Sequence, residues 1–284
     1  MSDTDGPSDA PPASEPTAED QDTPAFRDLL YSVDGHVATI TMNRPRRRNA
    51  LSGRLVNELI VALETAGDDA RVGAIVLEGA GGAFCSGGDL SQMAGGADDD
   101  RGDMPVRGGF VELNLAFTTV GKPVIAKIRR YAYGGGLGLV AASHFAIAED
   151  TAKLGTPEID RGVFPMMIMA WIFRTVPRRK GLEMILTGER ISADEAAECG
   201  LINRAVPPEH LDSEVQALAE VLASKPPAIV RLGLEAYHRQ DDLSVSEALP
   251  YLSDMLMKCF GTDDAREGLT AFLQKRKPTW PGRS

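Results

Sequence analysis

Tyr131-Ala132-Tyr133-Gly134-Gly135-Gly136-Leu137-Gly138 is the stretch on which the fold depends. It follows an apolar run at residues 123–128 that is typical of a buried β-strand, and it precedes a short run of small residues, 139–143, that favours a helix. Glycines at such a strand-to-helix turn permit unusual backbone angles and leave main-chain N–H groups open to a ligand. These N–H groups would lie at the positive end of a helix, where negative charge is stabilised. The stretch therefore predicts a site for a developing negative charge.

A second glycine turn, Ser86-Gly87-Gly88-Asp89, follows another buried strand at residues 72–77. If the two turns face each other across one cleft, their backbone donors converge on a single carbonyl oxygen, as in an oxyanion hole for an acyl thioester. Loss of one such donor typically costs about 3–4 kcal/mol in the barrier. Each cluster alone is also compatible with a tight packing turn. Neither is typical of nucleotide binding, because residues 79–84 lack the last glycine of GxGxxG and the chain has no GKS or GKT.

Glu158 is the best candidate for a general acid or base. It follows Thr156-Pro157 and comes shortly after a predicted strand. A carboxylate in an apolar cleft has a raised pKa and can move protons near neutrality. The alternative is a surface glutamate in a loop. The four histidines show no metal-binding spacing; His144 beside Ser143 allows a nucleophile interpretation, with an ordinary structural histidine as the alternative.

Composition and charge exclude several classes of function. The 284 residues carry a net charge of −11, and residues 1–24 hold seven acidic residues and no Lys or Arg, so the remaining chain carries −4. Such a chain lacks the basic surface that nucleic-acid binding needs. The three cysteines form no CxxC pair and predict reduced thiols. No apolar run is long enough to span a membrane, and the N-terminus lacks the basic start and apolar stretch of a signal peptide, so we expect a cytoplasmic protein.

The order of the predicted elements indicates three parts: a disordered acidic tail at residues 1–24, an α/β core at 25–200 and a helical region at 201–284. Strands and helices alternate in the core, which predicts a layered α/β fold. Residues 94–106 predict a mobile loop, and Ser192 with Glu195 predicts a capping box at a helix start. The predicted strands are 37–42, 72–77, 123–128 and 145–148, and the predicted helices are 51–67, 109–120, 209–224, 228–240, 245–260 and 263–275.

Taken together, these motifs resemble the enoyl-CoA hydratase/isomerase (crotonase) superfamily over residues 37–277. The resemblance rests on the two glycine turns and on the following motifs: Asn43-Arg-Pro with Asn49-Ala-Leu, Gly73-Ala-Ile-Val-Leu-Glu-Gly79, Ala83-Phe-Cys-Ser-Gly-Gly-Asp-Leu90, Gly155-Thr-Pro-Glu158, Leu186-Thr-Gly-Glu-Arg-Ile-Ser-Ala193 and Asp264-Ala-Arg-Glu-Gly268. It implies a spiral of ββα turns, a C-terminal helical trimerisation region, and trimers that often pair into hexamers.

The resemblance also implies roles for individual residues. The N–H groups of Gly88 and Gly135 would form the oxyanion hole, with Glu158 as the acid/base. The remaining residues would contact the acyl-CoA: Asp89, Leu90 and Ser91 on the thioester and pantetheine path, Arg46 and Ala50 at the coenzyme A head group, and Phe272 and Lys275 at the coenzyme A of a neighbouring subunit. Met93, Leu137 and Met166 are further candidates for substrate binding. No metal is implied, and no cofactor beyond the coenzyme A of the substrate.

Two departures from the family pattern bear on the reaction. Family hydratases use two glutamates, and the position of the first is Gly138 here, so only Glu158 remains. The chain also has Pro165-Met-Met-Ile-Met169 where hydratases have a glycine-rich turn. Moving a double bond from position 3 to position 2 needs one base, so isomerisation is slightly favoured over hydration of a trans-2-enoyl thioester. The alternatives are a hydratase proper, a non-catalytic acyl-CoA binding protein and a trimer without a ligand.

Overall fold

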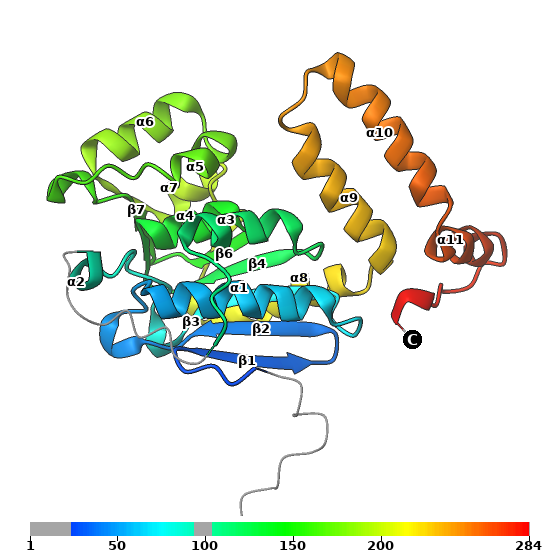
Figure 1. Ribbon diagram of the computed structural model, residues 1–284, viewed down its shortest axis with the longest axis horizontal. Coiled ribbons are helices and arrows are strands. Elements are labelled where there is room, and N and C mark those ends of the chain that lie inside the picture. Colours follow the sequence, from blue (N-terminus) through cyan, green and yellow to red (C-terminus); the bar gives the residue numbers. More distant parts are fainter. Residues whose placement is uncertain (1–23, 94–103, 284) are drawn as a thin grey trace, which may run out of the picture.

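The computed structural model describes residues 24–93 and 104–283 (Figure 1). The predicted acidic tail and most of the predicted loop at 94–106 lie outside these residues. Within them, helices and strands alternate along the first two thirds of the chain, so the predicted mixed α/β architecture is confirmed. The strands form two sheets, one of six strands and one of three.

The larger sheet forms the floor of the core. Its strands lie in the order β1-β2-β3-β4-β6-β9, with β1 antiparallel to β2 and all other neighbours parallel. Their bounds are β1 Leu29–Asp34, β2 Val37–Met42, β3 Ala74–Gly79, β4 Val124–Ile128, β6 Phe145–Glu149 and β9 Arg204–Val206. The central strands are buried on both faces, which explains their continuous apolar sequence.

The smaller sheet consists of three-residue strands beside the glycine-rich stretch. Strand β5 (Tyr131–Tyr133) runs parallel to β7 (Lys153–Gly155), which is antiparallel to β8 (Arg190–Ser192). The sequence analysis did not predict these strands, because three residues are too few to establish a period of two. They matter for function, since β5 and β7 end side by side.

The helices cover both faces of the large sheet and continue beyond it (Figure 1). Their bounds are α1 Gly53–Asp68, α2 Leu90–Met93, α3 Phe110–Thr119, α4 Gly135–Ala142, α5 Met169–Thr175, α6 Arg178–Thr187, α7 Ala193–Glu198, α8 Leu211–Ala223, α9 Pro227–Gln240, α10 Val245–Phe260 and α11 Asp263–Leu273. Helices α1, α3 and α4 share one hydrophobic core with the sheet, to which Leu55, Phe117 and Leu139 contribute.

Helix α8 packs on the opposite face of the sheet. Its Leu211, Val215 and Ala219 form a second apolar cluster with residues of β2, β3 and β4. Strand β9 and helix α8 thus lie beyond the predicted boundary at residue 200 and still pack on the core. The helices that stand away from the sheet are α9, α10 and α11, and Figure 1 shows α9 and α10 as a hairpin beside the core.

Two helix starts illustrate how local sequence sets these elements. The Ser52 hydroxyl accepts a hydrogen bond from the Leu55 amide at 3.2 Å and begins α1. The Ser192 hydroxyl does the same for the Glu195 amide at 3.1 Å at the start of α7. The second half of the predicted capping box is not formed among the described residues, because the Glu195 carboxylate pairs with Lys180 instead.

Candidate active site

The two glycine turns lie against each other. The chain at Cys85–Gly88 runs between Leu51 and strand β5: Leu51 forms a parallel bridge with Gly88, and Cys85 forms one with Ala132. The Leu51 amide donates to the Gly87 carbonyl at 2.9 Å, and the Tyr133 amide donates to the Cys85 carbonyl at 3.0 Å. A Cβ added at Gly87 would lie 3.5 Å from the Gly135 nitrogen. The predicted convergence of the turns therefore has a geometric basis.

The amides of Gly88 and Gly135 are available as donors. Gly135 is the first residue of α4, and the first N–H groups of a helix have no acceptor within it. Within the described part of the chain, neither the Gly88 amide nor the Gly135 amide donates a hydrogen bond. Gly87 (φ +97°) and Gly134 (φ +52°) hold conformations that favour glycine, and they set the direction of the two amides.

Strands β5 and β7 bring Glu158 to the same place. Tyr133 pairs with Gly155 at the ends of the two parallel strands, and the Gly134 amide donates to the Gly155 carbonyl at 2.9 Å. After β7 the buried Thr156 hydroxyl donates to the Met184 carbonyl at 2.9 Å and fixes the chain before Glu158. A Cβ added at Gly134 would collide with the Glu158 carboxyl group, whose Cδ would be 3.0 Å away. The carboxylate thus lies directly over the glycine turn.

The environment of Glu158 suits proton transfer. Its Oε2 atom is buried, and no described residue forms a hydrogen bond with it. Burial raises the pKa of Glu158 above its ordinary value, against smaller lowering effects of its own backbone amide and of the Arg161 charge. A glutamate with a raised pKa can hold and release a proton near neutrality.

The other side chains nearest to Gly135 and Gly138 are apolar. A Cβ added at Gly135 would lie 3.1 Å from Leu51 Cδ1 and 3.4 Å from Phe110 Cζ. A Cβ added at Gly138 would collide with Ile168 and would lie 3.7 Å from Phe110 Cζ. The sequence analysis did not identify Leu51, Phe110 or Ile168 as site residues, because their contacts with the glycines are remote in sequence.

Asp89 supports the site from below. Its side chain is buried, and its Oδ2 atom pairs with Arg44 Nη2 at 3.1 Å. The same arginine pairs through Nε with Asp28 Oδ2 at 3.2 Å. Burial acts to raise the pKa of Asp89, but hydrogen bonds from Ser91 and Arg44 outweigh it and lower the pKa. The ionised Asp89 therefore holds the turn after Gly88 to the loop at Arg44, a residue that the sequence analysis passed over in favour of Arg46.

The residues that the resemblance assigns to coenzyme A and to the acyl chain are spread more widely. Ala50 is buried, and its carbonyl accepts a hydrogen bond from Arg44; Arg46 and Ser91 are exposed nearby. Leu137 is fully buried in the core. Met166 is exposed. The backbones of Leu90 and Met93 begin and end α2, but their side chains lie outside the described part of the structure.

Phe272 and Lys275 do not reach this site within one chain. Phe272 lies in α11 with 80% of its surface exposed, and Lys275 follows the helix and is exposed too. Figure 1 places α11 on the opposite side of the molecule from α2.

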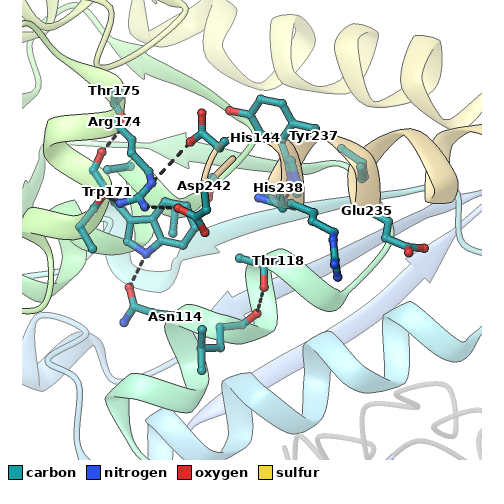
Figure 2. A pocket seen from close by; sticks show the side chains of 18 of the residues that line it. Asn114, Thr118, His144, Trp171, Arg174, Thr175, Glu235, Tyr237, His238 and Asp242 are labelled. Atoms are coloured by element: carbon teal, nitrogen blue, oxygen red, sulfur yellow. Dashed lines mark hydrogen bonds and ion pairs between the residues drawn. The ribbon is translucent and has the colours of Figure 1, made fainter. Parts of the chain in front are cut away.

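A large open volume of the described structure lies elsewhere. A cavity of about 1040 Å³ lies between α3, α5 and α9 and is lined by Asn114, Trp171, Arg174 and His238, among others (Figure 2). Gly88, Gly135 and Glu158 do not line it.

The nucleophile interpretation of Ser143 and His144 is not supported by the geometry. The Ser143 hydroxyl donates to the Leu139 carbonyl at 2.8 Å, whereas His144 bonds to the Val124 amide and to His238. In the described residues no group of three or more His, Cys, Asp or Glu side chains could hold a metal ion. All three cysteines are free thiols. None of the helices in the described ranges is both long and apolar enough to cross a membrane.

The chain is similar to known proteins over most of its length. A family model described as enoyl-CoA hydratase/isomerase matches residues 33–283. A protein of Rhizobium meliloti named probable enoyl-CoA hydratase is 37% identical over 254 residues, which cover 89% of this chain and 97% of that protein. The probable enoyl-CoA hydratase echA8 of Mycobacterium bovis is 35% identical over 265 residues, 91% of this chain and 99% of that protein. The crystal structure of an enoyl-CoA hydratase from Mycobacterium smegmatis superposes with a TM-score of 0.82 at 34% identity, covering 89% of this chain and 99% of that one.

Proposed function

This chain belongs to the enoyl-CoA hydratase/isomerase family, and we propose that it acts on unsaturated acyl-CoA thioesters at the site formed by the two glycine turns and Glu158. Its fold is the ββα spiral of that family. The observation that carries the proposal is the position of the Glu158 carboxyl group, which lies over Gly134 with one oxygen buried and without a partner among the described residues.

The Gly88 and Gly135 amides form the oxyanion hole of the proposed mechanism. Both would donate to the thioester oxygen as the α-carbon loses or gains a proton. These donors belong to the backbone of packed turns, so they need no reorganisation when the charge develops. Such preorganised donors often provide the largest single contribution to catalysis.

Glu158 is the carboxylate that lies against Gly134 at the start of α4, and we assign to it a single-base reaction. It takes a proton from the α-carbon of a 3-enoyl thioester and returns it two carbons away. The double bond thereby moves from position 3 to position 2. We expect this isomerisation to be favoured over hydration, since Ile168 and Phe110 leave no room for a carboxylate at position 138.

Hydration of a trans-2-enoyl thioester is the second candidate. It is favoured by the names of the relatives and of the solved structure, which are all enoyl-CoA hydratases. With Glu158 as sole acid/base, this reaction requires the same carboxylate to activate the water and to supply a proton to the α-carbon.

The coenzyme A contacts extend the proposal to an assembly. We assign Arg46 and Ala50 to the head group and Asp89 to Ser91 to the path of the thioester, without a metal or a separate cofactor. Phe272 and Lys275 lie far from their own glycine turns, so in this proposal they serve the site of a neighbouring subunit in a homotrimer or hexamer.

The test is a panel of 3-enoyl-CoA and trans-2-enoyl-CoA thioesters with the wild-type protein and Glu158→Gln. We expect conversion of the 3-enoyl substrates to 2-enoyl products and a loss of about 10²–10⁴ in kcat for the variant. Robust hydration of 2-enoyl-CoA that survives Glu158→Gln would refute the role of Glu158. Tight binding of acyl-CoA without turnover of any thioester would instead indicate a binding protein.

A further inference from the structure

Ile168 occupies the space above Gly138. Its Cβ lies 3.2 Å from the position that a Cβ at Gly138 would take, and its Cγ2 lies closer still. The Ile168 side chain is only 3% exposed. No side chain larger than glycine fits at position 138 without displacing it, so Ile168 takes the place of a second functional group in this part of the site.

A chain of hydrogen bonds fixes the position of Ile168 relative to Phe110. The Trp171 amide donates to the Ile168 carbonyl at 3.1 Å, and the Trp171 indole donates to Asn114 Oδ1 at 2.9 Å. The Asn114 side-chain amide in turn donates to the Phe110 carbonyl at 2.6 Å. Figure 2 shows the link between Trp171 and Asn114, which joins α5 to α3. Phe110 and Ile168, which form an apolar wall beside the glycine turn, are therefore held in place by both α3 and α5.

The composition of this wall decides what it can hold. The side chains nearest to Gly134, Gly135 and Gly138 are Glu158, Leu51, Phe110 and Ile168. An ordered water in a protein needs two to four polar partners. Of these four side chains, only Glu158 can hydrogen bond to a water. In the proposed mechanism the thioester oxygen occupies the Gly88 and Gly135 amides, so a water at the wall has no second partner among these groups.

We propose that Ile168 is a specificity-determining residue that keeps a reactive water out of the site, so that the proton on Glu158 returns to carbon. The inference rests on the proposed function. The Glu158 carboxylate takes a proton from C2, and the electron pair of that C–H bond moves toward the thioester oxygen. The dienolate then takes the same proton at C4, the C2–C3 double bond forms, the C3–C4 double bond is lost and the carbonyl is restored. Hydration would instead form a C3–O bond from water and add a hydrogen at C2.

The matched pair Ile168→Thr and Ile168→Val tests the inference. The two variants have the same shape and remove the same volume, and they differ only in a hydroxyl in place of a methyl group. The readout is the ratio of 3-hydroxyacyl-CoA to isomerised product from the same thioester, together with the melting temperature of each variant. We expect this ratio to rise about tenfold in the Thr variant relative to the Val variant, because the hydroxyl gives the water a second partner.

A double variant extends the test beyond a single hydrogen bond. Gly138→Glu with Ile168→Gly opens the space and places a second carboxylate there, and we expect its hydration to rise at least about 100-fold over Ile168→Gly alone. The inference is overturned if the wild type isomerises but neither comparison changes the product ratio, or if the wild type already hydrates as fast as it isomerises. A wild type that isomerises no 3-enoyl-CoA would refute the isomerase function itself, which is a separate result.

Discussion

The surroundings of the Glu158 side chain determine the chemistry that it can perform. Glu158 has one buried oxygen without a described partner, and burial raises its pKa. Because a base must be ionised to take a proton, this shift moves the pH dependence of the reaction rate upward from that of an ordinary glutamate.

The first prediction concerns that pH dependence. We expect kcat/KM for a 3-enoyl-CoA to rise with pH along a limb of unit slope, with its midpoint above the ordinary glutamate pKa, because only ionised Glu158 is a base. A pH–rate profile checks this. The control is Asp160→Asn, an exposed carboxylate two residues away that should leave the limb in place. An unchanged limb in Glu158→Gln would contradict the assignment.

The same shift predicts the effect of Glu158 on stability. A carboxyl group whose pKa is raised in the folded state binds more protons there than in the unfolded state, so its contribution to stability is lost as pH rises through the folded pKa. The free energy of unfolding of Glu158→Gln should therefore equal or exceed that of the wild type at neutral pH. Near pH 4 the variant should be no more stable than the wild type. Urea unfolding at both pH values measures this. A variant that is clearly less stable at neutral pH would contradict it.

Gly134 offers a third prediction at this scale. A methyl group here would meet the Glu158 carboxyl group, and the φ of +52° strains any side chain. We expect Gly134→Ala to lower kcat/KM about 100-fold, since a small displacement of a catalytic group has effects of that size. Gly35→Ala is the matched control, because Gly35 has a φ of +55° with no atom within 4 Å of its added Cβ. Equal losses in both variants would show that backbone strain alone is responsible.

At the scale of elements, a pair of histidines joins helix α9 to the core. His144 Nδ1 accepts a hydrogen bond from the Val124 amide at 3.1 Å, so in the neutral ring Nε2 carries the proton and donates to His238 Nε2 at 3.1 Å. Figure 2 shows the two residues on the wall of the cavity. Burial, and then the neighbouring His238, lower the pKa of His144 to about 4. Burial also lowers the pKa of His238, against the charge of Asp241.

The fourth prediction follows from this pair. The unfolded state binds the proton near pH 6.5 and the folded state near pH 4, so stability is lost as pH falls from about 6.5 to 4. Between pH 7.5 and 5, His144 accounts for about 2 kcal/mol of that loss. His144→Asn, which keeps an acceptor for Val124 but does not titrate, should show a smaller loss in urea unfolding. The exposed His210→Gln is the control and should behave like the wild type.

The elements also show what the sequence could predict. Strand β2 was predicted to the residue, and α10 with the right bounds, because both have a clear apolar period. The glycine turns and Glu158 were proposed from the sequence because glycine clusters and a carboxylate after a strand are visible locally. The wall at Ile168 was not, since its contact with Gly138 joins residues thirty positions apart. Leu137 was assigned to the substrate from the sequence; its side chain is fully buried, and its role stays a prediction.

At the scale of the whole molecule, helices α9, α10 and α11 expose an apolar surface. Its residues include Tyr237, Leu249, Met257, Phe260 and Phe272, all more than half exposed. Large apolar side chains that stay exposed are typical of an interface between proteins where they form one patch. This surface supports the proposed assembly, in which these helices contact neighbouring copies.

The fifth prediction tests whether sites are shared between copies. If Phe272 and Lys275 serve a neighbouring subunit, a sample reassembled from Glu158→Gln and Lys275→Ala chains should contain sites with an intact Glu158 and an intact neighbouring Lys275. We expect its activity to exceed the average of the two separate variants, with light scattering as the check that the mixture has the same mass as the wild-type oligomer. Activity equal to that average would place Lys275 in its own subunit's site or outside any site.

The most direct measurement of the central claim, that one carboxylate moves a proton along the acyl chain, follows an isotope. A 3-enoyl-CoA deuterated at C2 is converted by the wild-type protein in ordinary water in a single turnover, and the 2-enoyl product is examined by mass spectrometry and NMR. A single-base shuttle at Glu158 predicts deuterium at C4 of the product. In the Glu158→Gln variant, both the turnover and this deuterium transfer should be lost. A product hydroxylated at C3, or one with hydrogen from the solvent alone at C4, would contradict the account.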